Sequence, residues 1–164
     1  MVKMNNTKEA EWLTGSYKSI TIEEIVKIAK SHISLGGKVF LGSDSFVTNR
    51  KVIFASAVCL HGGELPSRYF FYRQKEPSKK YKNLNARITE EATRSIVLAQ
   101  DLIANYDFKV ENIELHLDAS PPEAGNGTSK IADALKGYIY GCGFNCKLKP
   151  EAWASQSVAD RHSK

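Results

Sequence analysis

The sequence predicts an α/β domain with a five-stranded mixed sheet flanked by helices. Three strand-like segments follow one another across short turns, which is typical of an antiparallel meander. Helical and strand-like segments then alternate, which favours parallel crossovers that place helices on the sheet faces. The length of 164 residues, with 42% hydrophobic and 25% charged residues, fits one globular domain and excludes a disordered chain. We expect an N-terminal extension over residues 1–19 and the domain over residues 20–164.

The first element after the extension is expected to be a helix, additional to the helices that follow the strands. Apolar side chains recur at helical spacing between Ile20 and Ile33. Thr21 is suited to cap the N-terminus, since its hydroxyl can accept a hydrogen bond from a free backbone N–H group. Gly36 and Gly37 end the helix, because glycine adopts the backbone conformations that terminate helices.

Three strands are expected next, at residues 39–45, 51–60 and 68–73. The second, KVIFASAVCL, is rich in the β-branched and aromatic side chains that favour strands. Turn residues at 48–50 and 61–63 separate the strands, so each is expected to pair antiparallel with the next. Residues 74–85 are polar and contain Pro77, which predicts a long loop.

Helices and strands alternate in the second half of the chain. An apolar stripe predicts a long helix over residues 87–105, and alternating side chains predict a strand over residues 112–118. A loop with proline and glycine is expected at residues 120–127. A helix at 128–140, a short strand at 144–148 and a last helix at 150–162 complete the domain.

Positive charge is concentrated in one segment. The formal net charge is +5, and residues 68–87 hold seven positive side chains against the single acid Glu76. Such a patch is typical of a protein with a polyanionic partner, although a solvated lysine-rich loop has the same composition. The candidate nucleic-acid-binding residues are Arg73, Lys75, Lys79, Lys80, Lys82 and Arg87.

Two further features exclude other classes of protein. No apolar run approaches the roughly 20 residues that span a bilayer, so no membrane partner is expected. Cys59, Cys142 and Cys146 are odd in number and lack CxxC spacing, which argues against a disulfide framework and a structural zinc site. We therefore expect a reducing, cytoplasmic location.

Several acidic residues fall where this topology can bring them together. Asp44 ends the first strand and Asp118 ends the fourth. If these strands are parallel neighbours, both acids lie at the sheet edge where open α/β sheets bind ligands. Glu91, with Glu90 as its direct rival, borders the buried stripe of the long helix, and Asp160 lies in the last helix. Each signal is weak alone, because acids at strand ends and on helices are often only solvated.

A cluster of four carboxylates would need compensating positive charge. Without a counterion, the carboxylates would repel one another and have raised pKa values. Two Mg²⁺ or Mn²⁺ ions would balance the four charges, and these ions prefer hard oxygen ligands. Two such ions can activate a water and stabilise the leaving oxygen of a phosphodiester. The candidate catalytic and metal-binding residues are Asp44, Glu91, Asp118 and Asp160.

Short motifs in a fixed order carry a family resemblance. They are Gly42-Ser43-Asp44-Ser45, Arg87-Ile88-x-x-Glu91, His116-Leu117-Asp118, and the C-terminal stretches at 149–154 and 157–164. With them the chain resembles the ribonuclease H-like superfamily, and more closely the YkuK-like family of predicted ribonuclease H-like nucleases, over about residues 20–164. The resemblance implies a metal-dependent nuclease acting on RNA, RNA–DNA hybrid or structured DNA. It assigns the binding of two metal ions to Asp44, Glu91, Asp118 and Asp160.

The roles of three secondary residues, and two alternative functions of the chain, stay open. Ser45 and His116 flank the acids and could orient a ligand or water, although His116 also fits a structural histidine facing a helix. His162 could assist proton transfer, or could lie in a frayed C-terminus. The chain could instead be a non-catalytic nucleic-acid-binding module of the same fold. A further alternative is a nucleotide or phosphate binder that uses residues 125–130, where glycines and Lys130 lead into a helix.

Overall fold

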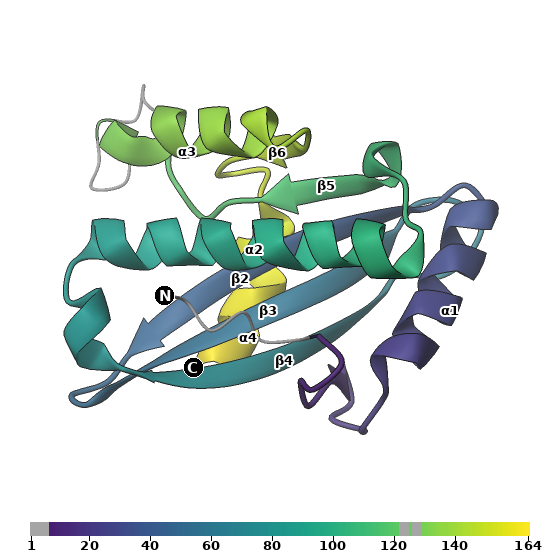
Figure 1. Cartoon of the computed structure of the whole chain (residues 1–164), viewed down its shortest axis with the longest axis horizontal. Helices are drawn as coiled ribbons and strands as arrows, with labels where there is room; N and C mark the ends of the chain where they lie inside the picture. The colour runs from purple at the N-terminus through teal and green to yellow at the C-terminus, as the bar shows by residue number, and fades with distance from the viewer. Residues whose placement is uncertain (1–6, 122–124, 126–128) are drawn as a thin grey trace.

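A six-stranded mixed sheet forms the centre of the molecule, in the order β1-β4-β3-β2-β5-β6 (Figure 1). The computed structural model describes residues 7–121, 125 and 129–164. The strands are β1 (Leu13–Thr14), β2 (Lys38–Val47), β3 (Lys51–His61), β4 (Arg68–Pro77), β5 (Ile113–His116) and β6 (Asn145–Lys147).

Strand pairing follows the meander-then-crossover order that the sequence predicts. β2, β3 and β4 pair antiparallel, and β5 pairs parallel with both β2 and β6. The β2–β5 register runs from Val39 opposite Ile113 to Gly42 opposite His116. The strands that carry or precede Asp44 and Asp118 are therefore parallel neighbours, which is the condition under which both acids lie at one edge of the sheet.

Helices cover both faces of the sheet. The long helix α2 (Leu84–Tyr106) lies on one face, and the C-terminal helix crosses the other (Figure 1). We use "C-terminal helix" for the π-helical segment η4 (Ala154–Ala159) together with α4 (Asp160–Ser163). The remaining helices are α1 (Ile22–Ser34), η1 (Ser78–Tyr81), η2 (Val110–Asn112) and α3 (Ser129–Gly141).

Two apolar clusters hold these layers together. The larger packs α1, α2 and α3 against the sheet and includes Leu41, Val58 and Ile96. The smaller lies under the C-terminal helix and joins Phe71 to Ala154 and Ala159. Successive side chains of a strand point to opposite faces, so one strand contributes to both clusters. Among the described residues, no helix is long and apolar enough to cross a membrane.

Several elements differ from the sequence-based expectation. β5 ends at His116, so Asp118 follows the strand rather than ending it, and β2 continues past Asp44 to Val47. β1 adds a sixth strand, but its two residues are too few to give a periodic signal. β4 continues to Pro77 and η1 follows it, so residues 74–81 are not the predicted loop. Pro77 is tolerated because this end of β4 is an edge within the described part of the chain: β1 pairs with β4 only at Phe70 and Phe71. The last helix contains a π-helical segment, in which each hydrogen bond spans one residue more than in an α-helix.

Candidate active site

Asp44 lies where the sheet edge opens. β5 ends opposite Gly42, and within the described part of the chain no strand pairs with the β5 side of β2 beyond that point. Asp44 is the second residue past Gly42 and is 6% exposed. Its side chain lies on the face that the C-terminal helix covers, because Ser163 Oγ donates a hydrogen bond to Asp44 Oδ2 at 2.8 Å.

Gly42 allows the C-terminal helix to approach this strand closely. A Cβ atom at Gly42 would lie 2.4 Å from the backbone nitrogen of Ser155, a separation that the helix could not accommodate without moving. His116 secures the same segment, since its Nδ1 accepts a hydrogen bond from the backbone N–H of Ala154 at 3.0 Å. The end of the helix is thereby brought over Asp44.

Glu91 approaches the opening from the other face of the sheet. It is buried on α2, and Ser45 Oγ donates a hydrogen bond to its Oε1 at 2.6 Å. The side chain of Glu90 instead forms an ion pair with Arg94 at 2.9 Å. The structure therefore places Glu91, and not its rival Glu90, beside the strand that carries Asp44.

Asp118 and Asp160 complete the acidic set, and each pairs with a lysine. Asp118 lies two residues beyond the end of β5, and its Oδ1 is 2.9 Å from Lys149 Nζ, a contact without hydrogen-bond geometry. Asp160 begins α4, and its Oδ1 is 3.1 Å from Lys164 Nζ. Both acids are more exposed than Asp44, with side chains 18% and 36% accessible for Asp118 and Asp160.

The four acids interact electrostatically. Burial raises the pKa of Asp44 to about 7, the Ser163 hydrogen bond opposes the rise, and the charges of Asp118 and Asp160 add to it. Burial also raises the pKa of Glu91 well above its usual value, and the charges of Asp44 and Asp118 contribute. The charges of neighbouring acids thus disfavour the ionised forms of the two buried carboxylates, Asp44 and Glu91.

We call Asp44, Glu91, Asp118 and Asp160 the acidic cluster. The chemistry of its side chains suits a hard divalent cation. Its carboxylate oxygens are the ligands that Mg²⁺ and Mn²⁺ prefer, and its negative charge is incompletely compensated. Across the described residues, no three carboxylate, imidazole or thiol groups are arranged to ligate one ion. Lysine side chains instead contact Asp118 and Asp160, so ligation by these two acids would require the lysines to move.

The two secondary histidines both have protein partners at each ring nitrogen. His116 Nε2 lies 3.1 Å from Glu114 Oε1, while its Nδ1 accepts the N–H of Ala154. His162 stacks on Phe71, and its ring nitrogens lie 3.3 Å and 2.9 Å from the hydroxyls of Tyr17 and Tyr69. In this arrangement both rings position the C-terminal helix. Ser45, the third secondary candidate, orients Glu91.

The candidate nucleic-acid-binding residues divide between two locations. Arg73 and Lys75 are exposed on β4, on the face that carries Asp44. The others follow this strand, at or near η1 and the start of α2, at the same end of the sheet as Asp44 (Figure 1). Arg87 donates a hydrogen bond to the Tyr81 carbonyl at 3.3 Å. The exposed lysines of this second group are Lys79, Lys80 and Lys82.

Sequence reasoning assigned no role to Ser163 or to Lys149. Ser163 is fully buried against Asp44, and Lys149 pairs with Asp118. A serine next to a C-terminus and a lysine before a proline carry no local pattern that predicts such contacts. The phosphate-binding alternative at residues 125–130 includes residues 126–128, which lie outside the described residues.

We expect replacement of Ser163 by alanine to weaken the site. Loss of the hydrogen bond leaves Asp44 without its orienting donor, and changes of this kind typically cost about 10- to 100-fold in metal affinity or activity. The measurements are the Mn²⁺ dissociation constant and the cleavage rate of Ser163→Ala. Ser155→Ala is the matched control, because Ser155 is equally buried in the same helix but donates to the Ala152 carbonyl. Equal behaviour of the two variants would contradict the assignment.

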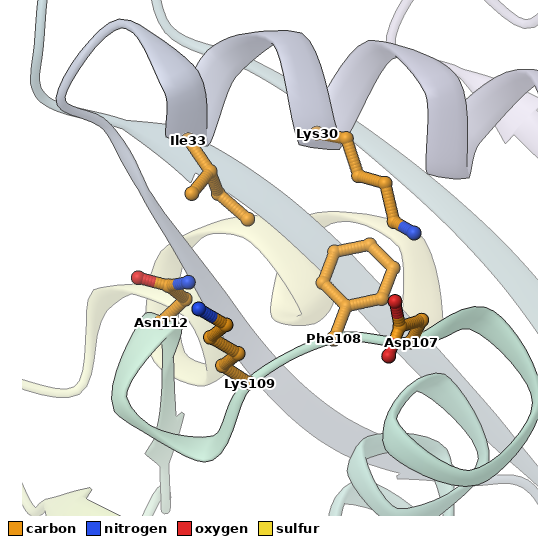
Figure 2. A pocket seen from close by; sticks show the side chains of 6 residues that line it. All are labelled: Lys30, Ile33, Asp107, Phe108, Lys109 and Asn112. Atoms are coloured by element: carbon orange, nitrogen blue, oxygen red, sulfur yellow. The ribbon is translucent and has the colours of Figure 1, made fainter.

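A separate hollow at the opposite end of the sheet lies away from the acids. It has a volume of about 240 Å³ between α1 and the connection from α2 to β5. Figure 2 shows Lys30 and Ile33 of α1 on one side and Phe108, Lys109 and Asn112 on the other. Its two lysines provide a matched control for the charge variants described below.

The fold is that of an α/β protein with a mixed sheet, and the acidic cluster forms a candidate site at the edge of that sheet. The family model described as ribonuclease H-like matches residues 21–164. The chain therefore belongs to the ribonuclease H-like family, which confirms the resemblance carried by its motifs. No curated protein and no solved structure matches the chain.

Proposed function

We propose that the chain is a metal-dependent nuclease that hydrolyses phosphodiester bonds of RNA, RNA–DNA hybrid or structured DNA. The observation that carries the proposal is that four acids, from β2, α2, the segment after β5 and α4, lie near the open edge of β2, where their charges act on Asp44 or Glu91. Family membership adds support, because the fold is one on which nucleases occur, although a fold by itself does not determine activity.

Each residue of the site has a distinct proposed task. Asp44, Glu91, Asp118 and Asp160 would hold two Mg²⁺ or Mn²⁺ ions, which when bound supply an activated water and stabilise the leaving oxygen. Ser163 and Ser45 orient Asp44 and Glu91. Lys149 compensates the charge of Asp118.

A cleavage assay tests this function. The purified chain is incubated with end-labelled RNA, RNA–DNA hybrid and branched DNA, with Mg²⁺, with Mn²⁺ and with a chelator. We expect cleavage of at least one substrate with a metal ion and none with the chelator. Binding of all three substrates without product under any metal condition would contradict the nuclease and support the alternative below.

Lysines at η1 are expected to contribute to substrate binding. Neutralising Lys79, Lys80 and Lys82 together removes up to three phosphate contacts, so the slope of log affinity against log salt becomes shallower by about 2. Fluorescence anisotropy titrations at several salt concentrations measure the slope. The control neutralises three exposed lysines at the other end of the sheet, Lys27, Lys30 and Lys109. An unchanged slope in the η1 variant would exclude these lysines from the interface.

A second candidate function is a nucleic-acid-binding module without turnover. Two observations favour it: Lys149 and Lys164 pair with two of the acids, and the described residues contain no assembled metal-ligating group. Such a module binds equally well with or without metal ions, and Asp44→Asn leaves its binding unchanged. The nuclease instead loses its activity with this substitution.

A further inference from the structure

The sheet face that carries Asp44 continues beyond the C-terminal helix, and with only the described residues considered, Phe46, Arg73 and Lys75 are exposed on it. Figure 1 shows the ends of β2, β3 and β4 extending past this helix. Residues opposite one another in an antiparallel pair share a face, so strand register identifies what lies on this surface. One row across the sheet is Asp44–Ala55–Arg73, and the next row outward is Phe46–Ile53–Lys75.

These two rows combine an exposed aromatic ring with unpaired positive charge. Phe46 is 40% exposed, an unusual environment for a phenylalanine in a strand. Arg73 and Lys75 are exposed, and neither forms an ion pair with any carboxylate in the part of the chain that the structure describes. Beside them, a hollow of about 270 Å³ is lined by Glu11, Leu13, Ile53, Arg73 and Lys75.

We propose that this surface, formed by Phe46, Ile53, Arg73 and Lys75 and called here the strand-end surface, binds a single-stranded segment of nucleic acid that leads to Asp44. The inference rests on the proposed function in taking nucleic acid as the ligand, and it adds the strandedness and the binding residues.

The side-chain chemistry of the strand-end surface and its position near Asp44 both support single-stranded nucleic acid as the ligand. An aromatic side chain beside cationic groups is the arrangement that binds single strands, because bases stack on the ring while phosphates contact the cations. A duplex keeps its bases stacked on one another and presents only their edges and its backbone. Phe46 is two residues along the strand from Asp44, a separation of about 7 Å, so a base on the ring lies within about one nucleotide of the acid.

Substitution of the ring gives the sharpest test. Fluorescence anisotropy with a labelled single-stranded oligonucleotide and a matching duplex is measured in chelator, so that neither metal nor cleavage contributes. We expect Phe46→Ala to weaken single-strand binding by about 5- to 100-fold, to leave duplex binding unchanged, and to leave the salt slope unchanged. Phe46→Trp restores single-strand affinity because it restores the stacking surface. Circular dichroism checks that both variants fold.

Charge is tested separately. The double variant Arg73→Gln with Lys75→Gln is expected to make the salt slope of single-strand binding shallower by about 1.4, since each phosphate contact contributes about 0.7. The matched control is Lys30→Gln with Lys109→Gln, which removes the same charge beside the hollow of Figure 2 at the other end of the sheet. This control is expected to keep the wild-type slope.

The outcomes separate this inference from the proposed nuclease. Single-strand affinity that is unchanged in Phe46→Ala overturns the strand-end surface, and so do equal losses for single strand and duplex. If the wild-type chain cleaves while these variants bind normally, the proposed nuclease function stands and the strand-end surface is excluded. If the chain binds single strands through Phe46 but never cleaves, the strand-end surface stands and the nuclease function is excluded.

Discussion

Replacing Asp44 or Asp118 by asparagine is expected to abolish metal-dependent cleavage while leaving the fold intact. Both side chains stand at the opening beside β2, where an amide of the same shape cannot supply the negative charge that holds a divalent cation. Asparagine at position 44 keeps the carbonyl oxygen that accepts the Ser163 hydrogen bond, so packing of the C-terminal helix is preserved. The measurement is the cleavage rate with Mn²⁺, together with circular dichroism of each variant.

A matched control for this loss is Asp133→Asn. Asp133 is exposed on α3, and the substitution removes the same charge away from the acidic cluster. It should cleave like the wild type. Full activity in purified Asp44→Asn or Asp118→Asn would contradict the assignment of the acids, whatever the behaviour of the control.

The same substitution at Asp44 is expected to stabilise the protein in the absence of metal ions. Burial raises the pKa of Asp44 from its usual value of 3.8 to about 7, so the folded state binds this proton more tightly than the unfolded state does. The free energy of unfolding therefore falls as the pH rises from about 4 to about 7, and stays reduced above pH 7. The shift corresponds to an upper limit of about 4 kcal/mol. Glu91, whose pKa is also raised, adds a loss of the same sign.

Denaturant unfolding of the wild type and Asp44→Asn between pH 4 and pH 8 measures this effect. The variant should lose much of the pH dependence and should be the more stable protein at pH 8, with a melting temperature higher by about 5 °C or more. Ser43→Ala is a control at the neighbouring position, because Ser43 bonds to Ser56 and Ser95 on the other face and carries no charge. Identical pH profiles for the wild type and Asp44→Asn would contradict the raised pKa.

Strong local patterns allowed much of this fold to be predicted. The β-rich run of β3 and the apolar stripe of α2 each have the period of a single secondary structure, and short turns determine that β2, β3 and β4 pair in sequence. The sequence favoured parallel crossovers but left open whether β5 pairs with β2, and the structure shows that it does. Asp44 and Asp118 therefore come to one edge of the sheet as a consequence of topology.

The contacts that define the site could not be predicted in the same way. The choice between Glu90 and Glu91 depends on Arg94, which pairs with Glu90 one turn along α2. The hydrogen bond from Ser163 to Asp44 joins residues 119 positions apart. It depends on the close approach of the C-terminal helix to β2, which Gly42 permits. Such contacts follow from the placement of the C-terminal helix against the sheet, which has no periodic signal in the sequence.

The central claim is that a divalent cation binds among acids brought together from distant parts of the chain. Diffraction from crystals soaked in Mn²⁺, recorded at the manganese absorption edge, tests it directly. We expect an anomalous peak bonded to carboxylate oxygens of Asp44 and Asp118, with Lys149 displaced from Asp118. Crystals saturated with Mn²⁺ that show no peak there, and in which Lys149 keeps its present contact with Asp118, would contradict the claim.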